Sequence, residues 1–144
     1  SPGNNTSGEL ESIPLKDTAP VQVTMGIGKD RETREILPEN TGNTRNRGAA
    51  AIILKELEPV EIYLGENLAD LRGYMVINGQ RQVLPIGSTL DAKTGKFYWV
   101  PGPGYIGTYR LEFVMEESGG PCYRRNIEIT IEPKFPGPGI SMPK

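Results

Sequence analysis

The chain has 144 residues and a formal net charge of −2, a size that suits one ordinary domain. The weakly acidic charge argues against binding to nucleic acid or to an anionic membrane surface. With no histidine and a single cysteine, the chain lacks the usual base of Ser-His-Asp and Cys-His catalysis. It also lacks the commonest zinc, copper and haem ligand and any internal disulfide.

Turn-forming residues are abundant, with 18 glycines and 13 prolines, and 36% of the residues are hydrophobic. This combination favours an all-β domain with many turns, or a smaller core with polar arms. The longest apolar run, Ala49 to Leu54, has the length of a strand. A bilayer-spanning helix needs about 18 apolar residues, so we expect no membrane span.

The N-terminal region divides into an arm and an extension. Residues 1–19 are polar and rich in turn formers, which predicts a polar N-terminal arm. Residues 20–57 follow as a strand-containing extension. Its first strand is expected from Pro20 to Ile27, where apolar and polar residues alternate. The apolar positions are Val21, Val23, Met25 and Ile27.

The rest of the extension is less regular. Gly28 to Gly48 has mixed charges, which predicts a solvated loop or hairpin. Ala49 to Leu57 contains Ala, Leu, Lys and Glu and is compatible with a short helix. Nine residues are marginal for a helix, however, and Ile52 and Leu54 also fit a strand. We favour a strand or an extended linker here.

Residues 58–133 are expected to form the core of the domain. Val60, Ile62 and Leu64 make the apolar side of one strand. Another strand, Gly73 to Ile77, ends at Asn78-Gly79, the residue pair that most favours a two-residue hairpin turn. The return strand is expected at Gln82 to Ile86.

The second half of this core also consists of short strands separated by turns. Lys96 to Val100 follows a turn at Asp91 to Gly95. Gly107 to Glu116 then places Tyr109, Leu111, Phe113 and Met115 on a core face, and Arg110, Glu112 and Glu116 on a solvent face. An alternating partner strand contains Ile127, Ile129 and Ile131. Residues 134–144 form a Pro/Gly-rich tail or linker. These short strands predict an all-β sandwich, with a barrel as the alternative.

One segment also carries a recognisable pattern. Leu90-Asp91-Ala92-Lys93-Thr94-Gly95-Lys96-Phe97-Tyr98-Trp99-Val100-Pro101, followed by Gly107-Thr108-Tyr109, resembles the signature of bacterial putative immunoglobulin-like and cadherin-like modules. The resemblance implies an immunoglobulin-like antiparallel β-sandwich in an extracellular, cell-surface or periplasmic protein. The positions that it marks as structural are Leu90, Asp91, Thr94, Gly95, Phe97, Trp99, Pro101, Gly107 and Tyr109. The acidic calcium motifs of cadherin-like members are missing from the sequence, so we expect no metal site.

These observations predict a non-enzymatic module without catalytic residues or cofactors. We expect a role in structure, adhesion or assembly, with neighbouring domains or identical subunits as partners. The sharper hypothesis is self-association by β-strand addition, because two strand-like segments precede the family-like core. Its expected contacts are Val21, Val23, Met25, Ile27, Ile52 and Leu54.

The alternative function is carbohydrate binding, as an accessory module of a larger extracellular enzyme. Tyr63 and Tyr98 are out of phase with the core positions of their strands, so we expect both rings to be exposed. Tyr105 is the third candidate aromatic contact. Cys122 lies near Arg124 and Arg125, which favours its thiolate form. Without a base or a second cysteine, it is the weakest candidate for a reactive site.

Overall fold

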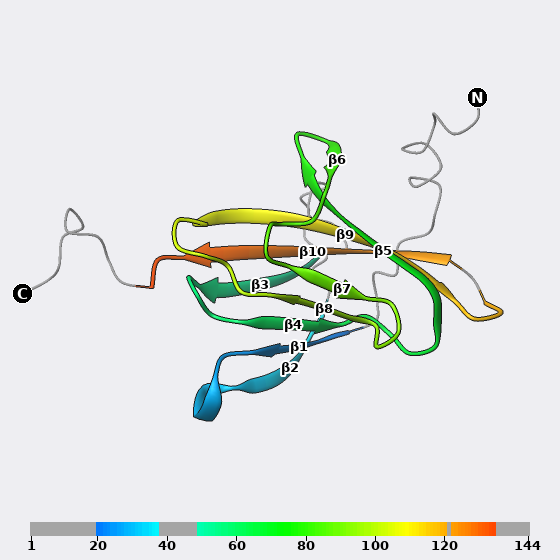
Figure 1. The fold of residues 1–144 in the computed structure, drawn as a ribbon, viewed down its shortest axis with the longest axis horizontal. Coiled ribbons are helices and arrows are strands. Elements are labelled where there is room, and N and C mark those ends of the chain that lie inside the picture. The colour runs from blue at the N-terminus through cyan, green and yellow to red at the C-terminus, as the bar shows by residue number, and fades with distance from the viewer. Residues whose placement is uncertain (1–19, 38–48, 121, 135–144) are drawn as a thin grey trace, which may run out of the picture.

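The computed structural model describes residues 20–37, 49–120 and 122–134. Two five-stranded sheets pack face to face as a sandwich (Figure 1). This arrangement confirms the all-β prediction and favours the sandwich over the barrel. The predicted polar arm at residues 1–19 and almost all of the predicted tail at 134–144 lie outside the described residues.

The first sheet has the strand order β2-β1-β4-β8-β7. Its strands are β1 (Val21–Met25), β2 (Glu32–Ile36), β4 (Val60–Tyr63), β7 (Thr89–Asp91) and β8 (Lys96–Trp99). A 3₁₀ turn, η2 (Gly28–Asp30), joins β1 to β2. The predicted alternation stops early, since Ile27 is 67% exposed. The strand ends because Gly26 adopts a φ of 94°, which turns the chain away from the sheet.

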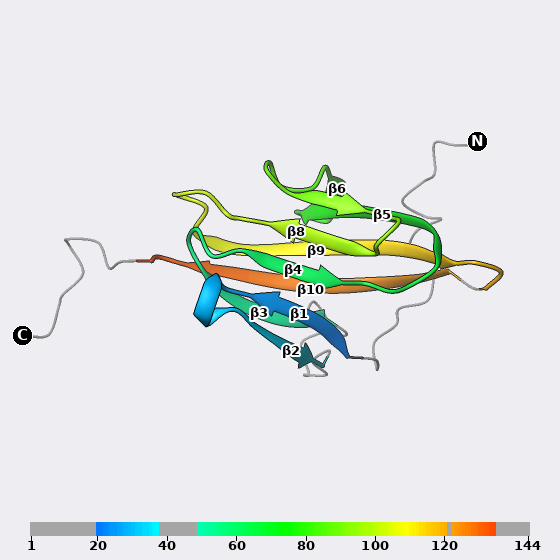
Figure 2. The same ribbon diagram turned by 60° about the horizontal axis from the view of Figure 1, so that its bottom comes forward.

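The second sheet has the order β3-β10-β9-β5-β6. Its strands are β3 (Ala49–Lys55), β5 (Leu68–Ile77), β6 (Gln80–Gln82), β9 (Gly107–Glu117) and β10 (Cys122–Glu132). The ambiguous segment after residue 48 is therefore a strand, as we favoured. It lies beside β10 (Figures 1 and 2) and runs parallel to it, with Ala49 opposite Asn126. The expectation of a purely antiparallel sandwich is wrong at this pair.

Within residues 20–57, the described strands belong to the sandwich. β1 lies between β2 and β4 in the first sheet, and β3 pairs with β10 in the second. The predicted boundary at residue 58 therefore falls inside the sandwich, since each sheet takes strands from both sides of it. Within the mixed-charge segment, Glu32–Ile36 forms the second arm of the β1–β2 hairpin, and residues 38–48 lie outside the described part of the chain.

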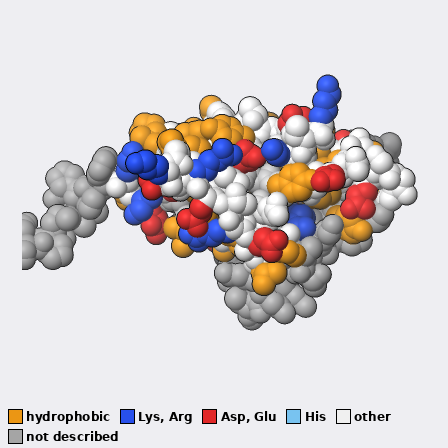
Figure 3. All heavy atoms as spheres, turned by 90° about the horizontal axis from the view of Figure 1, so that it is seen from below, with side chains coloured by type: hydrophobic (Ala, Val, Ile, Leu, Met, Phe, Trp, Pro, Cys, Tyr) orange, Lys and Arg blue, Asp and Glu red, His pale blue; other side chains and the backbone are white. Residues whose placement is uncertain are grey.

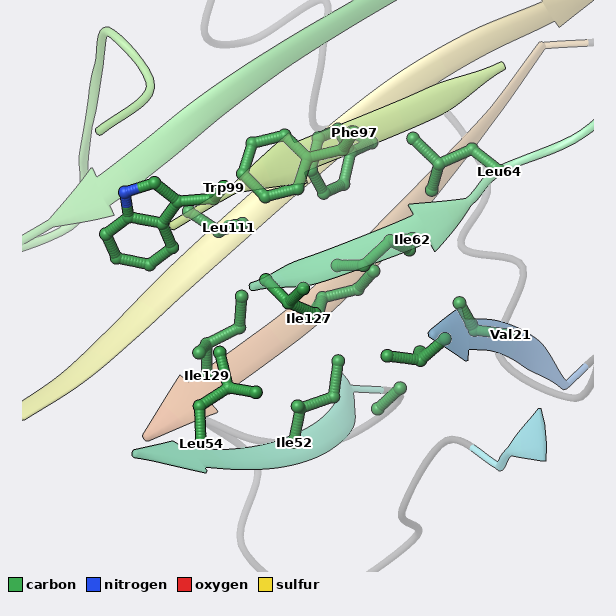
Figure 4. Packing of buried hydrophobic residues seen from close by; sticks show 14 of the residues in the cluster. Val21, Ile52, Leu54, Ile62, Leu64, Phe97, Trp99, Leu111, Ile127 and Ile129 are labelled. Carbon is green, nitrogen blue, oxygen red and sulfur yellow. The ribbon is translucent and has the colours of Figure 1, made fainter. Parts of the chain in front are cut away.

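The core lies between the two sheets and is rich in aromatic rings. Phe97 of β8 packs edge-on against Phe113 of β9, with ring centroids 5.3 Å apart. Figure 4 shows Phe97 and Trp99 together with aliphatic side chains of β3, β4, β9 and β10. Phe97, Trp99 and Phe113 are fully buried. The aromatic residues of the β8 signature thus supply much of the apolar area that holds the sandwich together.

The turn between β7 and β8 explains one signature glycine. The Gly95 N–H donates to the Asp91 carbonyl at 2.8 Å, and the Gly95 carbonyl accepts the N–H of Leu64 at 2.6 Å. Gly95 has a φ of 71°, and a Cβ atom there would lie 1.9 Å from the Gly65 carbonyl oxygen. Only glycine fits this position, because both the backbone conformation and the close approach exclude a side chain.

The Asn78-Gly79 hairpin is confirmed, but its return strand is misplaced in the prediction. Both turn residues have positive φ, and Ile77 pairs directly with Gln80. The return strand is therefore Gln80–Gln82 instead of Gln82 to Ile86. A two-residue turn starts pairing at once, and Pro85 has no N–H to continue it. Val83 and Ile86 remain 79% and 80% exposed in the connection to β7.

Candidate functional site

The residues expected to make strand-addition contacts lie mostly inside the chain's own sandwich. Val21, Val23 and Met25 on β1 and Ile52 and Leu54 on β3 are buried, and Ile27 is exposed beyond the end of β1. β1 is paired along both of its edges. β3 pairs with β10 and stands at the end of its sheet. Of the two strands, β3 is the one with a backbone edge that no other described strand covers.

The four edge strands of the sandwich differ in how well they resist pairing with another chain. β2 (ETREI) is charged and exposed, and β6 and β7 have three residues each. Short length and charged side chains are the usual means of blocking an exposed edge. β3 (AAAIILK) has seven residues and no charge before Lys55. Among the described strands, β3 is the unprotected edge.

The side chains of β3 alternate between the core and the outer face of the sheet. Ala50, Ile52 and Leu54 are buried in the core, whereas Ile53 on the other side is 63% exposed. Lys55 is the last residue of the strand, and its Nζ lies 3.9 Å from Glu132 Oε1. We call the outer backbone edge of Ala49–Lys55, with the exposed Ile53 side chain, the β3 edge. Its last N–H, that of Lys55, donates to Glu58 Oε1 at 2.9 Å. The rest of this edge pairs with no other described strand and lies beside exposed apolar surface.

The outer face of the first sheet carries two of the three predicted aromatic contacts. Tyr63 lies opposite Lys96, and Tyr98 lies opposite Glu61, on the adjacent strands β4 and β8. Tyr98 is 42% exposed and Tyr63 is half-buried. Burial raises the pKa of Tyr63, and its hydrogen bond to the Glu66 carboxylate raises that pKa further. The two rings are diagonal neighbours on one surface.

Two hollows of about 410 and 440 Å³ lie on this face and share Thr24 and Glu61 in their linings. The Glu61 carboxylate pairs with Lys96 at 3.2 Å and with Arg31 at 3.8 Å. Figure 3 shows the molecule from below, a different side from this face. Acidic and basic side chains are interspersed there as well. Tyr105 does not lie on the outer face that carries Tyr63 and Tyr98. It is half-buried, and its ring packs against Trp99 and Tyr109.

The other signature positions are structural in their placement. Asp91 and Gly95 form the β7–β8 turn, where the Asp91 carboxylate also accepts the N–H of Lys93 at 2.9 Å. Thr94 is exposed in this turn, Pro101 is buried, and Leu90 and Gly107 are half-buried. Tyr109 packs edge-on against Trp99 at 5.5 Å. None of the described side-chain contacts gives these residues a ligand-binding arrangement.

Sequence reasoning missed a buried ionic cluster on the outer face of the second sheet. Glu112, expected to be solvated, is only 3% exposed. Its Oε1 accepts Arg81 Nε at 2.7 Å, and its Oε2 accepts Arg124 Nη1 at 2.6 Å. A hollow of about 210 Å³ lies beside the cluster. Alternation along β9 cannot reveal it, because the two arginines come from β6 and β10.

A second carboxylate joins three separate segments at one end of the sandwich. Glu56, in the turn between β3 and β4, accepts the backbone N–H of Gly104 at 2.8 Å and that of Lys134 at 3.1 Å. These hydrogen bonds lower the pKa of Glu56, with the Gly104 bond contributing most. The neighbouring Leu57, with a φ of 65°, donates its N–H to the Pro101 carbonyl at 2.9 Å. Glu56 therefore stabilises the folded chain in its ionised form.

The Glu56→Gln variant should be less stable than the wild type at neutral pH, and the deficit should shrink in acid. A pKa that is lower in the folded state gives stability that is present above the unfolded pKa, about 4.3 for glutamate. That stability is lost as the pH falls through the folded pKa. Thermal unfolding midpoints between pH 7 and pH 3 measure this. Glu35→Gln, on the exposed strand β2, is the control. An unchanged deficit for Glu56→Gln at pH 3 would contradict the assignment.

In the described part of the chain, no group of three or more His, Cys, Asp or Glu side chains is placed to hold a metal ion. Cys122 is an exposed free thiol. Among residues 20–37, 49–120 and 122–134, no helix is long and apolar enough to cross a membrane.

Comparison with known proteins adds no family. No protein-family model matches the chain, and no curated protein matches it. The likeness to immunoglobulin-like and cadherin-like modules therefore depends on the residues of the β7–β9 segment alone. The described part of the chain forms an all-β sandwich of two five-stranded sheets.

Proposed function

We propose that the chain is a non-enzymatic structural, adhesion or assembly module that self-associates by strand addition at the β3 edge. The observation that carries the proposal is the contrast between β3 and the other three edge strands. β2, β6 and β7 have the charge or short length that discourages pairing, whereas β3 is long and apolar. An extracellular, cell-surface or periplasmic location belongs to this proposal, and its support is the resemblance of the β7–β9 segment.

The energetics of such an association follow from the edge itself. An added strand would form main-chain hydrogen bonds along β3, and side-chain contacts would provide specificity. Ile53 is 63% exposed, and covering it would contribute about 1–2 kcal/mol. Because the core-facing side chains of β3 are already buried, pairing requires no opening of the sandwich.

The Ile53→Lys variant should associate at least tenfold more weakly than the wild type, because a charged side chain at an edge opposes pairing. Sedimentation equilibrium over a wide concentration range gives the association constants. Ile86→Lys is the matched control, since Ile86 is 80% exposed in the distant β6–β7 connection. A wild type that stays monomeric at its highest soluble concentration would refute self-association. Equal effects of the two variants would show that the β3 edge is not the interface.

A second candidate function is carbohydrate binding at the tyrosine face, defined by Tyr63, Tyr98 and the hollows beside Glu61. The observation that favours it is that both rings lie on one side of β4 and β8, next to polar side chains such as Gln22 and Thr24. Sugar rings commonly stack on exposed aromatic rings while their hydroxyl groups bond to polar neighbours. Here the charges of Glu61 and Lys96 offset each other, which suits a neutral saccharide.

Tyr98→Ala should abolish glycan binding if this second candidate is correct, because it removes the more exposed of the two rings. A glycan array probed with the labelled protein is the measurement. Tyr74→Ala is the control: Tyr74 is half-buried and pairs with Glu112 on the other sheet. Loss of binding in both variants would point to a general effect on folding, and a blank array with the wild type would reject the candidate.

A further inference from the structure

We infer that the strand added at the β3 edge is β3 of a second copy of this chain, antiparallel and related by a two-fold axis through Ile52. The inference rests on the proposed self-association through the β3 edge. It goes further by specifying the partner strand, its direction, its register and the number of copies. The argument comes from the order of small and large residues along β3.

Antiparallel pairing about Ile52 sets Ile52 of the two copies beside each other and opposes an alanine to a larger residue at all the other positions of β3. On the outer face, Ile53 of each copy would lie opposite Ala51 of the other. The exposed isoleucine side chain would then pack over a small alanine. Lys55 would lie opposite Ala49, and the lysines of the two copies would sit at opposite ends of the pair. Cross-strand neighbours are the main determinants of which strands pair. No like charges meet within the seven residues of β3.

Neighbouring registers fit less well. Centring the axis on Ile53 would place the two exposed isoleucines against each other and extend the pairing beyond Lys55, where β3 ends. Centring it on Ala51 would leave Leu54 and Lys55 without partners in the β3 of the other copy. A shift of the pairing by a single residue would put the core face of one copy against the outer face of the other. The Ile52 register uses all seven residues and keeps the two outer faces aligned.

The geometry also predicts where assembly stops. A two-fold contact uses the same edge on both copies, so each β3 edge is consumed when the dimer forms. The other edge strands in the described part of the sandwich, β2, β6 and β7, are charged or short, and they discourage further strand addition. The product is a closed dimer in which the two sheets that contain β3 form one continuous sheet.

Disulfide trapping tests the register directly. In the full chain with Cys122→Ser, two further variants carry Ala51→Cys or Ile53→Cys. A mixture of the two should form cross-linked dimers several-fold faster than either variant alone, because positions 51 and 53 lie directly opposite only between unlike chains. Ile86→Cys in the same background is the control for random collision. Peptide mapping identifies the bond, and sedimentation gives the size of the product.

Hydrogen exchange on the unmodified chain gives a second measurement that needs no substitution. The β3 amides that do not pair with β10 should gain protection over the concentration range in which dimers form, apart from the Lys55 amide, which already donates to Glu58 Oε1. Assemblies larger than a dimer, or faster trapping between like chains than between unlike chains, would overturn the inferred register. If Ile53→Lys still blocked association in that case, the proposed function would stand without it. Absence of any association would refute both.

Discussion

Replacing Trp99 with alanine should lower the free energy of unfolding by about 3–5 kcal/mol. Trp99 is 0% exposed, and its ring centroid lies 5.5 Å from that of Tyr109 and 6.1 Å from that of Tyr105. Alanine would remove this apolar area and leave a cavity that the two tyrosines fill only in part. Strands on both sides of the sandwich hold the backbone around the site, so the cavity cannot close by a local shift.

Trp99→Phe should cost clearly less than Trp99→Ala. Phenylalanine keeps part of the ring volume, and it also removes the buried indole N–H, which has no hydrogen-bond partner within the described residues. Leaving such a group unpaired costs about 1–3 kcal/mol, so its removal offsets part of the lost packing. Urea denaturation at equilibrium measures both variants, with the exposed neighbour Tyr98→Ala as the control. A loss below about 1 kcal/mol for Trp99→Ala would mean that Trp99 is not central to the core.

Replacing Glu112 with alanine should also destabilise the fold by about 3–5 kcal/mol, the usual cost of removing one partner from a buried ion pair. The side chains of Arg81 and Arg124 are only 13% and 15% exposed. In the variant, both guanidinium groups would lose the Glu112 carboxylate that lies between them. Because both side chains are largely buried, contact with water would not replace the lost ion pairs. The strand β6, which contributes Arg81 and has only three residues, also loses its side-chain contact with β9.

The control for the ionic cluster is Glu116→Ala, on the same strand and the same face as Glu112 but exposed. It should change stability by less than about 0.5 kcal/mol. Glu112→Gln keeps the shape of the side chain and removes its charge. Its loss of stability should lie between those of Glu112→Ala and Glu116→Ala. Denaturation in low and high salt adds a further measurement, because a buried pair is screened much less than a surface pair. A strongly salt-dependent loss would place the cluster in solvent and contradict its burial.

The sequence was most informative where side-chain alternation and local turns decide the structure. β4, β9 and β10 and the Asn78-Gly79 turn follow from patterns within a few residues. The outward position of Tyr98 follows from the same phase argument. The same argument did not predict the half-buried position of Tyr105. That position depends on contact with the Trp99 ring of β8, which no local sequence pattern encodes.

The errors in the domain boundary and at Glu112 share one physical origin, which is contact between residues that are distant in the sequence. The boundary at residue 58 ignored β3, whose neighbour in the sheet, β10, comes near the C-terminal end of the described chain. Glu112 looked solvated because the guanidinium groups that bury it come from two other strands. The strand-addition hypothesis correctly singled out β3 as a strand-like segment. That β3 is an edge strand and β1 an inner one became clear only from the sheet order.

The parallel pairing of β3 with β10 also affects the order of folding. Ala49 pairs with Asn126, so this contact can form only after nearly all of the described chain has been synthesised. Closing so long a loop delays pairing, and sheets dominated by such contacts typically fold over milliseconds to seconds. During that interval the AAAIILK segment has no partner on either edge. The newly made chain is then at its greatest risk of aggregation, and rapid pairing of β9 with β10 would shorten that period.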